Sequence, residues 1–141
     1  ICAYLAETEA GGTLAPAVGE RAAYLRWMFF AAGPMEQAIT ARSAGLEPSE
    51  RQQVSFGFGS YDRMVDTLAA HCRANDFVCG SRFTMADVYV GSHVMWGTMF
   101  KTLPELPEFL AYGQRLMARP AYAEAKAIDE ALIAAMREKQ S

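Results

Sequence analysis

The stretch Phe83-Thr84-Met85-Ala86-Asp87-Val88 has the features of a helix start around which the rest of the chain can fold. Thr84 is a favoured N-cap residue, because its hydroxyl can accept a hydrogen bond from the amide of Asp87. The carboxylate of Asp87 can reach back to the amide of Thr84, which makes a capping box with Asp in place of Glu or Gln. Phe83 and Val88 occupy the two positions of a hydrophobic staple. These four residues therefore predict a structural role, the fixing of a helix start.

The helix expected after this start, from Met85 to about Thr102, is apolar on nearly every face. Its large apolar residues are Val88, Tyr89, Val90, Val94, Met95, Trp96, Met99 and Phe100. A helix that is apolar all round is normally buried. We therefore expect a central buried helix, starting at Thr84, inside an all-α bundle of about five to six helices.

A long helix is expected before it, from Val18 to Ser43. One side of this helix carries Ala22, Leu25, Phe29, Ala32 and Ile39. Gly33-Pro34 predicts a kink, because proline lacks an amide hydrogen and clashes with the preceding turn. Gly45 is expected to end the helix, since glycine readily adopts the left-handed conformation found after helix C-termini.

Three further helices are expected in the rest of the chain. One runs from Ser49-Glu50 to about Ala74, and its Gly57 and Gly59 are expected where a neighbouring helix approaches closely. We leave open whether the face around these glycines packs within the bundle or against a second subunit. Two shorter helices follow, from Pro107 to Ala118 and from Ala121 to about Glu138. No segment has the alternation of a strand, so we predict an all-α fold.

The composition indicates a single domain without signals for nucleic acid, membrane or metal. The 141 residues are 52% hydrophobic, which is enough for a sizeable core. The net charge of -3, without a basic run, argues against a nucleic-acid partner, and charged residues interrupt every long apolar run. Cys2, Cys72 and Cys79 form no disulfide framework, and His71 and His93 lie too far apart for a helical metal motif. We therefore expect a reduced, cytoplasmic, metal-free protein.

The first residues have the pattern of the end of a helix rather than of a capped start. Its apolar face comprises Ile1, Cys2, Leu5 and Ala6. Gly11-Gly12 and Pro16 then interrupt any regular structure. We therefore expect residues 1–8 to be the remnant of the last helix of a preceding domain, residues 9–16 to be a linker, and residues 17–141 to form the helical domain.

A series of short motifs resembles a known family along essentially the whole chain. The motifs are Tyr4-Leu5-Ala6, Leu14-Ala15-Pro16, Arg21-Ala22 with Arg26-Trp27, the segment from Phe77 to Val88, Trp96, and Met117-Ala118-Arg119-Pro120-Ala121. This series resembles the helical C-terminal domain of bacterial cytosolic glutathione transferases, the Beta class most of all. The most specific part is the Gly80 to Asp87 segment, which in that family caps the buried helix of the domain.

The resemblance implies a two-domain enzyme that conjugates glutathione to small hydrophobic electrophiles. A thioredoxin-like domain would bind the co-substrate glutathione and activate its thiol, whereas the helical domain would supply the wall of the electrophile site and much of a homodimer interface. The chain as given lacks the first domain, so we expect it to be inactive alone. Without the first domain, apolar surface on the long and central helices would be uncovered, and we expect self-association.

The resemblance also implies candidates for the electrophile-pocket wall: Phe29, Gly33, Glu36, His93 and Trp96. The first three share a face of the long helix at spacings of three and four residues, and the last two, with Ser92, share a face of the central helix. No catalytic residue is assigned. A carboxylate at Glu36 would repel a thiolate. It could instead form an ion pair with the glutathione amine or with an arginine of a partner subunit.

Other interpretations of these residues and of the fold stay open at this point. Phe29 and Trp96 could be core residues, His93 a core or interface histidine, and Glu36 a solvated side chain. Within the same fold, the enzyme could be a glutathione-dependent isomerase, dehalogenase or disulfide reductase. The domain could also be a non-catalytic scaffold or interaction module, which predicts no pocket beside the domain junction.

Overall fold

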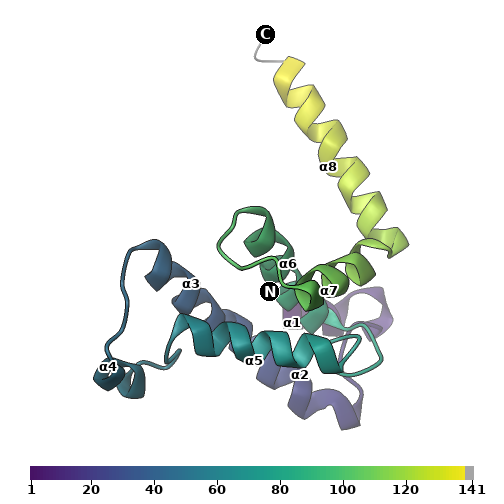
Figure 1. Ribbon diagram of the computed structural model, residues 1–141. Helices are drawn as coiled ribbons and strands as arrows, with labels where there is room; N and C mark the ends of the chain where they lie inside the picture. The colour runs from purple at the N-terminus through teal and green to yellow at the C-terminus, as the bar shows by residue number, and fades with distance from the viewer. Residues whose placement is uncertain (139–141) are drawn as a thin grey trace.

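The computed structural model describes residues 1–138, which form an all-α fold (Figure 1). The α-helices are α1 (Cys2–Thr8), α2 (Arg21–Phe30), α3 (Glu36–Ser43), α4 (Glu50–Ser55), α5 (Tyr61–Ala74), α6 (Met85–Met99), α7 (Pro107–Met117) and α8 (Pro120–Glu138). Short 3-10 segments, η1 (Ala10–Gly12) and η2 (Val18–Glu20), and a π-helical segment, η3 (Ala31–Met35), connect some of them. Within residues 1–138 the sole β feature is an isolated bridge between Phe77 and Gly80, so the predicted all-α class is confirmed.

Helix α6 is the centre of the bundle and packs against α1, α2 and α7. Its inward stripe consists mainly of small residues, namely Ala86, Asp87, Val90, Gly91, Val94 and Gly97. A Cβ added at Gly91 would lie 2.2 Å from Leu116 Cδ1 of α7, so this glycine allows the close approach of the two helices. The expectation that α6 is buried on all sides is wrong, because Val88, Trp96, Met99 and Phe100 are exposed.

The start of α6 is a capping box, as predicted. Asp87 Oδ2 accepts hydrogen bonds from the Thr84 amide at 2.9 Å and from the Thr84 hydroxyl at 3.2 Å, while the Asp87 amide donates to the Thr84 carbonyl oxygen at 3.0 Å. Both residues are fully buried. Phe83 and Val88, the predicted staple residues, line the same surface pocket. The local sequence signal therefore places the central helix correctly.

The long helix runs as predicted from Val18 to Ser43, but it turns a different face to the core. The π-helical turn at Ala31–Met35 contains Pro34, which takes up the expected irregularity. The buried side chains are Tyr24, Trp27, Ala31, Met35 and Ala38. The side predicted to be apolar, from Ala22 through Leu25 and Phe29 to Ala32, faces solvent instead. Gly45 ends the helix with a φ of 73°, as predicted.

The helix predicted from Glu50 to Ala74 is interrupted, and this prediction is wrong. Helix α4 ends at Ser55, and α5 begins at Tyr61 with Ser60 as its N-cap. Gly59 has a φ of 67° in the intervening turn, a conformation that L-residues rarely adopt. Gly57 faces nothing closer than Gln37 Oε1 at 4.0 Å from its added Cβ. These glycines therefore break the helix, and the expected close approach to a neighbour is not found at either one.

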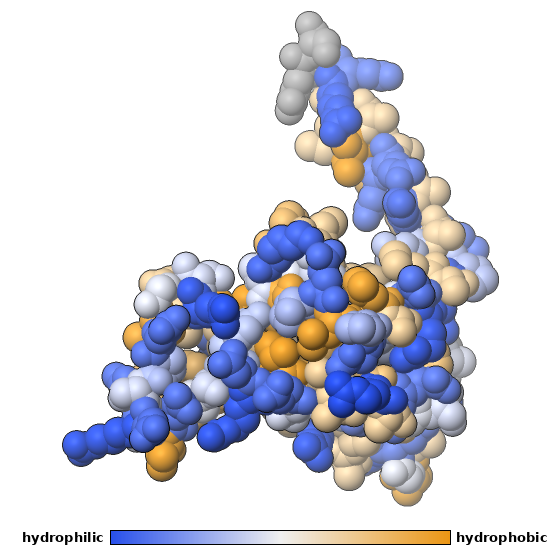
Figure 2. All heavy atoms as spheres, in the orientation of Figure 1, coloured by the Kyte–Doolittle hydropathy of each residue, from blue (hydrophilic) through white to orange (hydrophobic). Residues whose placement is uncertain are grey.

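Helix α8 projects from the body of the molecule (Figure 1). Among the described elements it packs only against α7, the helix before it. Its apolar residues Ile128, Leu132, Ile133 and Met136 are all exposed. Figure 2 shows hydrophobic and hydrophilic residues interleaved along this helix. Over residues 1–138, no helix has the length and apolar character needed to cross a membrane.

Candidate functional site

A pocket between α3 and α6 contains three of the five residues predicted for the electrophile-pocket wall. Glu36 lies at the start of α3, and His93 and Trp96 follow each other on one face of α6. The pocket has a volume of about 400 Å³. Its lining residues are Glu36, Ile39, Ser92, His93, Trp96, Gly97, Phe100 and Thr102. We refer to it below as the Glu36–His93 pocket.

His93 is held between two hydrogen-bond acceptors. Its Nδ1 lies 3.0 Å from the carbonyl oxygen of Tyr89, one turn earlier in α6. Its Nε2 lies 3.3 Å from Glu36 Oε2. A neutral imidazole has one N–H and can donate to one of these oxygens, whereas the doubly protonated ring can donate to both. The half-buried ring therefore links the start of α3 to α6 next to the pocket.

Two aromatic residues at the C-terminal end of α6 also line the Glu36–His93 pocket. Trp96 and Phe100 meet edge to face with their ring centroids 6.1 Å apart. Both rings are largely exposed, at 64% and 63% of their surface. Neither residue is part of the core, so they leave an open apolar face beside the polar pair. Such a combination of an apolar wall and a few polar groups is typical of small-molecule pockets.

Phe29 and Gly33 do not line the Glu36–His93 pocket. Phe29 is 71% exposed on the outward face of α2. Gly33 belongs to the π-helical turn, and a Cβ added there would have no neighbour within 4 Å. The π-helical turn between Phe29 and Glu36 alters the helical register, so a face calculated from regular α-helical spacing does not hold across it.

Several pocket residues were not among the sequence candidates. Phe100 lies four residues after Trp96 and could have been added from helical spacing alone. Ile39 lies three residues after Glu36 and could have been found in the same way. Thr102 follows the C-terminus of α6 in a turn where Lys101 has a φ of 62°, so no periodic signal would have placed it there.

Two of the three cysteines, Cys72 and Cys79, are poor sources of a thiolate. Burial raises the pKa of the Cys72 thiol to about 12. Burial also raises the pKa of Cys79, although the hydrogen bond between this thiol and the Thr84 hydroxyl opposes the shift. A protonated thiol is a poor nucleophile. No group of three or more His, Cys, Asp or Glu residues suited to a metal ion occurs among residues 1–138.

Asp87 belongs to a structural network beneath the start of α6. Besides its bonds to Thr84, its Oδ1 accepts from the Val78 amide at 2.8 Å and from the Tyr112 hydroxyl at 2.9 Å. These donors use the accepting capacity of a fully buried carboxylate. The contacts of Asp87 are therefore those expected of a residue that holds the fold.

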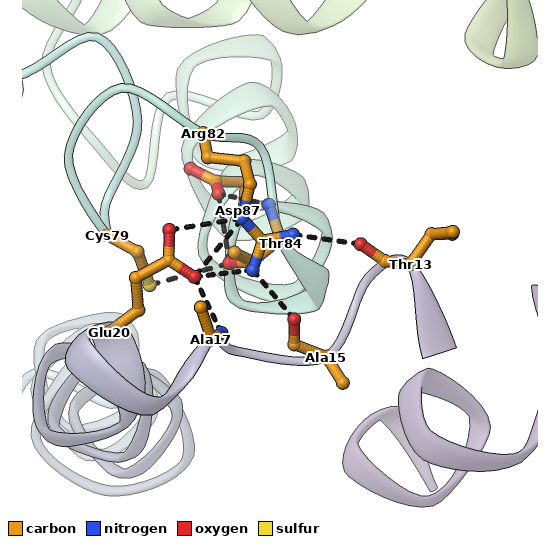
Figure 3. A network of polar contacts seen from close by, with 8 residues as sticks. All are labelled: Thr13, Ala15, Ala17, Glu20, Cys79, Arg82, Thr84 and Asp87. Carbon is orange, nitrogen blue, oxygen red and sulfur yellow. Dashed lines mark hydrogen bonds and ion pairs between the residues drawn. The ribbon is translucent and has the colours of Figure 1, made fainter. Parts of the chain in front are cut away.

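Arg82, next to this cap, holds the segment between α1 and α2 (Figure 3). Its Nη1 donates to the Thr13 carbonyl oxygen at 2.9 Å, and its Nη2 donates to the Ala15 carbonyl oxygen at 2.7 Å. The guanidinium also forms an ion pair with Glu20. The hydrogen bonds that Arg82 and the Ala17 amide donate to the Glu20 carboxylate lower the pKa of this carboxyl group. The Met85 amide adds a bond to the Leu14 carbonyl oxygen at 2.9 Å. Residues 13–20 are therefore fixed to the start of α6.

Comparison with protein families gives a match over part of this chain. Residues 37–96 match the model of the glutathione S-transferase C-terminal domain. This range runs from α3 to α6 and includes His93 and Trp96, whereas Glu36 lies one residue before it. Searches of curated proteins and of solved structures gave no match. The match supports a C-terminal domain of the glutathione transferase type, in agreement with the family resemblance of the sequence.

Proposed function

We propose that this chain, with its glutathione transferase C-terminal-type domain, is part of an enzyme that conjugates glutathione to small hydrophobic electrophiles. The observation that carries this proposal is the Glu36–His93 pocket, whose two α6 residues lie inside the matched range. A scaffold module of the same fold would need no such pocket. In this proposal, glutathione is a co-substrate bound mainly by a thioredoxin-like domain, and the protein is a cytoplasmic homodimer.

The aromatic wall of the pocket would bind the electrophile. Trp96 and Phe100 expose apolar ring faces next to the open side of the pocket. An aromatic electrophile could stack on or meet the edge of these rings, an interaction of about 0.5–1.5 kcal/mol beyond area burial. These residues would thus favour binding of the second substrate and would take no part in bond making.

The polar side of the pocket would orient glutathione and would not activate its thiol. The Glu36 carboxylate is 62% exposed and would repel a nearby thiolate. It could attract the amine of the glutamyl group, and His93 holds it in place at 3.3 Å. Burial raises the pKa of the Cys72 and Cys79 thiols, so neither offers an alternative nucleophile. The thiolate would therefore be stabilised by groups of the thioredoxin-like domain.

The proposal is tested by conjugation of glutathione to 1-chloro-2,4-dinitrobenzene with the complete gene product. We expect Trp96→Ala to raise the KM for the electrophile by about two- to tenfold, which corresponds to the loss of one aromatic contact. We expect Glu36→Gln to change the KM for glutathione instead. Val54→Ala on α4, an exposed position far from the pocket lining, serves as a control and should leave both constants unchanged.

Two results would contradict the proposal. A complete gene product that neither binds glutathione nor conjugates any electrophile would exclude the function itself. A fully active Trp96→Ala variant with unchanged KM values would exclude the pocket assignment. Glutathione-dependent isomerisation, dehalogenation or disulfide reduction without conjugation would favour another enzyme of the same fold.

A further inference from the structure

Arg82 attaches the segment between α1 and α2 to the start of α6 through all three nitrogens of its guanidinium (Figure 3). Its Nε donates to the Glu20 carboxylate at 3.1 Å. Its Nη1 donates to the Thr13 carbonyl oxygen at 2.9 Å, and its Nη2 donates to the Ala15 carbonyl oxygen at 2.7 Å. A planar guanidinium that bonds three separate groups holds them in one geometry. We call these four residues the Arg82 clasp.

A turn with two glycines precedes the Arg82 clasp. Gly11 and Gly12 have φ angles of 63° and 72°, a region that glycine enters readily and other residues rarely do. A Cβ added at Gly11 would meet no atom within 4 Å, so neighbouring atoms do not confine this turn. Helix α1, before the turn, packs against α6, and among its residues Cys2–Thr8 Ala6 alone is buried. The clasp is therefore the main polar restraint on the path from α1 to α2.

Helix α6 connects the clasp to the Glu36–His93 pocket. Arg82 lies two residues before the N-cap Thr84, and His93 and Trp96 follow on the same helix. At a rise of 1.5 Å per residue, these two pocket residues lie roughly 14 and 18 Å along the helix from the cap. Arg82 is therefore too far away to contact a substrate in the pocket. It can act there only by fixing where residues 13–20 lie relative to α6.

From this geometry we propose that Arg82 is a positioning residue, which fixes the orientation of the thioredoxin-like domain of the proposed enzyme relative to the Glu36–His93 pocket. This inference rests on the proposed function, in which that domain is joined to the helical bundle through α1 and residues 9–16 and brings glutathione to the pocket. Conjugation requires the glutathione sulfur and the electrophilic carbon to meet in one alignment, and small displacements slow such a step strongly. Loss of the clasp slows the chemical step and leaves the binding contacts of each substrate in place.

The first test measures the kinetics of Arg82→Gln in the complete gene product, with glutathione and 1-chloro-2,4-dinitrobenzene. We expect kcat to fall by about tenfold to hundredfold, because the reacting atoms are displaced. The KM values for both substrates should change by less than about twofold, since the residues that bind each substrate stay in place. Ionisation of the bound glutathione thiol, followed by the ultraviolet absorbance of the thiolate, should equal that of the wild type. This combination separates misalignment from a loss of thiol activation.

The second test measures the orientation of the two domains without catalysis. Residual dipolar couplings of the backbone amides, recorded by NMR in a weakly aligning medium, report whether two domains move as one body. In the wild type, the thioredoxin-like domain and the helical bundle should share one alignment tensor. In Arg82→Gln, we expect two tensors of different magnitude, because the glycine turn then lets the domains reorient.

Three variants separate the clasp from general effects on folding. Arg82→Lys keeps the charge beside Glu20 but loses the planar fork, so it should recover part of kcat, and it carries the comparison if Arg82→Gln fails to fold. Glu20→Gln removes the ion pair and leaves the bonds to the two carbonyl oxygens, so its effect should be smaller. Gly59→Ala introduces strain at a φ of 67° in the turn between α4 and α5, and it should change neither kcat nor the shared tensor.

The proposal is overturned if Arg82→Gln keeps the kcat of the wild type. It is also overturned if kcat falls while the two domains still share one alignment tensor, since Arg82 would then act by another route. Two independent tensors in the wild type would contradict it as well. A wild-type protein without conjugating activity would instead contradict the proposed function, and the alignment tensors would then decide alone whether Arg82 orients the domain.

Discussion

Two buried tyrosines differ in whether their hydroxyl groups have a partner. The Tyr112 hydroxyl donates to Asp87 Oδ1 at 2.9 Å. The Tyr24 hydroxyl is the one buried side-chain polar group without a partner in the part of the chain that the structure describes. A buried polar group without a partner loses its hydration without compensation. The same substitution, tyrosine to phenylalanine, should therefore have opposite effects on the free energy of unfolding at the two positions.

We expect Tyr24→Phe to raise the free energy of unfolding and Tyr112→Phe to lower it. The gain at Tyr24 should be about 0.5–1.5 kcal/mol, and the loss at Tyr112 about 1–3 kcal/mol because a buried carboxylate loses a donor. Urea unfolding followed by circular dichroism measures both. A loss of stability in Tyr24→Phe would show that its hydroxyl has a partner, such as a buried water molecule.

His71 is a second single residue with a measurable consequence. Its ring lies on Trp27, with ring centroids 4.1 Å apart, and its Nε2 faces the Val78 carbonyl oxygen at 3.0 Å. Burial lowers the pKa of His71 from its ordinary value of 6.5, and the charge of Arg26 adds to the effect. The hydrogen bond to Val78 opposes the shift. The folded protein therefore keeps this ring neutral at a pH where the unfolded chain is protonated.

The sign of the resulting pH dependence follows from proton uptake. As the pH falls through 6.5, the unfolded chain binds a proton at His71 before the folded protein does, so the folded state loses stability. We expect the free energy of unfolding to decrease between neutral pH and the lower folded-state pKa of His71. Glu20 and Glu108, whose pKa values are lowered, act in a separate and more acidic range.

An NMR titration measures this effect directly, with His93→Gln used to assign the two histidine rings. His71 should titrate below pH 6.5, and the stability should become less dependent on pH in this range in His71→Asn. A His71 ring that titrates at or above its ordinary value would contradict the prediction.

Among the secondary-structure elements, the turn between α4 and α5 contains two glycines, Gly57 and Gly59, whose substitution should have different effects. Gly59 has a φ of 67°, and a Cβ there would lie 3.3 Å from Arg63 Nη1. We expect Gly59→Ala to lower the free energy of unfolding by about 1–2 kcal/mol. Gly57 has no positive φ and has room for a Cβ, so Gly57→Ala should be neutral or stabilising by about 0.4–1 kcal/mol.

Thermal unfolding of the two alanine variants tests this difference. Equal destabilisation by both substitutions would support the original expectation of a close helix contact at both glycines. The matching test for a true close contact is Gly91→Ala, where the added Cβ meets Leu116. Shortening that side chain in Gly91→Ala with Leu116→Ala should recover part of the loss caused by the glycine substitution.

The sequence predicted those elements whose signals are local. The capping box at Thr84 and Asp87, the end of the long helix at Gly45 and the start of α7 at Pro107 depend on neighbouring residues, and all were confirmed. The inward face of the long helix was not predicted correctly, because apolar residues surround much of α2 and packing selects among them. The break at Gly59 was also missed, since glycine is compatible with both a helix and a turn.

For the candidate site, the sequence could group residues that lie on the same helix, but it could not show which residues of different helices come together. Helical spacing placed His93 and Trp96 on one face of α6, and the family resemblance added Glu36. The 3.3 Å approach of Glu36 to His93 depends on how α3 crosses α6, which spacing does not describe. The π-helical turn at Pro34 separated Phe29 and Gly33 from Glu36, because one irregular turn changes the direction of every later side chain.

Over the molecule as a whole, apolar side chains on α2 and α6 are exposed to solvent, in addition to those of α8. Leu25 and Phe29 are exposed on α2, and Trp96 and Phe100 are exposed on α6 and at its C-terminal end. Exposed apolar patches of this kind favour association. We expect sedimentation velocity to show species heavier than the 15.5 kDa monomer as the concentration rises.

Two substitutions should reduce this association. Phe29→Glu and Trp96→Glu each place a charge on the exposed apolar surface, whereas Val54→Glu places one at an exposed position on α4. We expect the first two to shift the protein toward the monomer and the third to have no effect. A monodisperse wild-type monomer at all concentrations would contradict the prediction.

The hold of Arg82 on residues 13–20 has a consequence for proteolysis. A protease must draw several residues of extended chain into its active site, and the bonds to Thr13, Leu14 and Ala15 resist this. Thermolysin, which cleaves before leucine, should therefore spare Leu14 in the native protein and cut first at exposed Leu46. In Arg82→Gln the bond before Leu14 should become a cleavage site. The segment before α2 would then owe much of its protection to one guanidinium, in spite of a composition typical of protease-sensitive linkers.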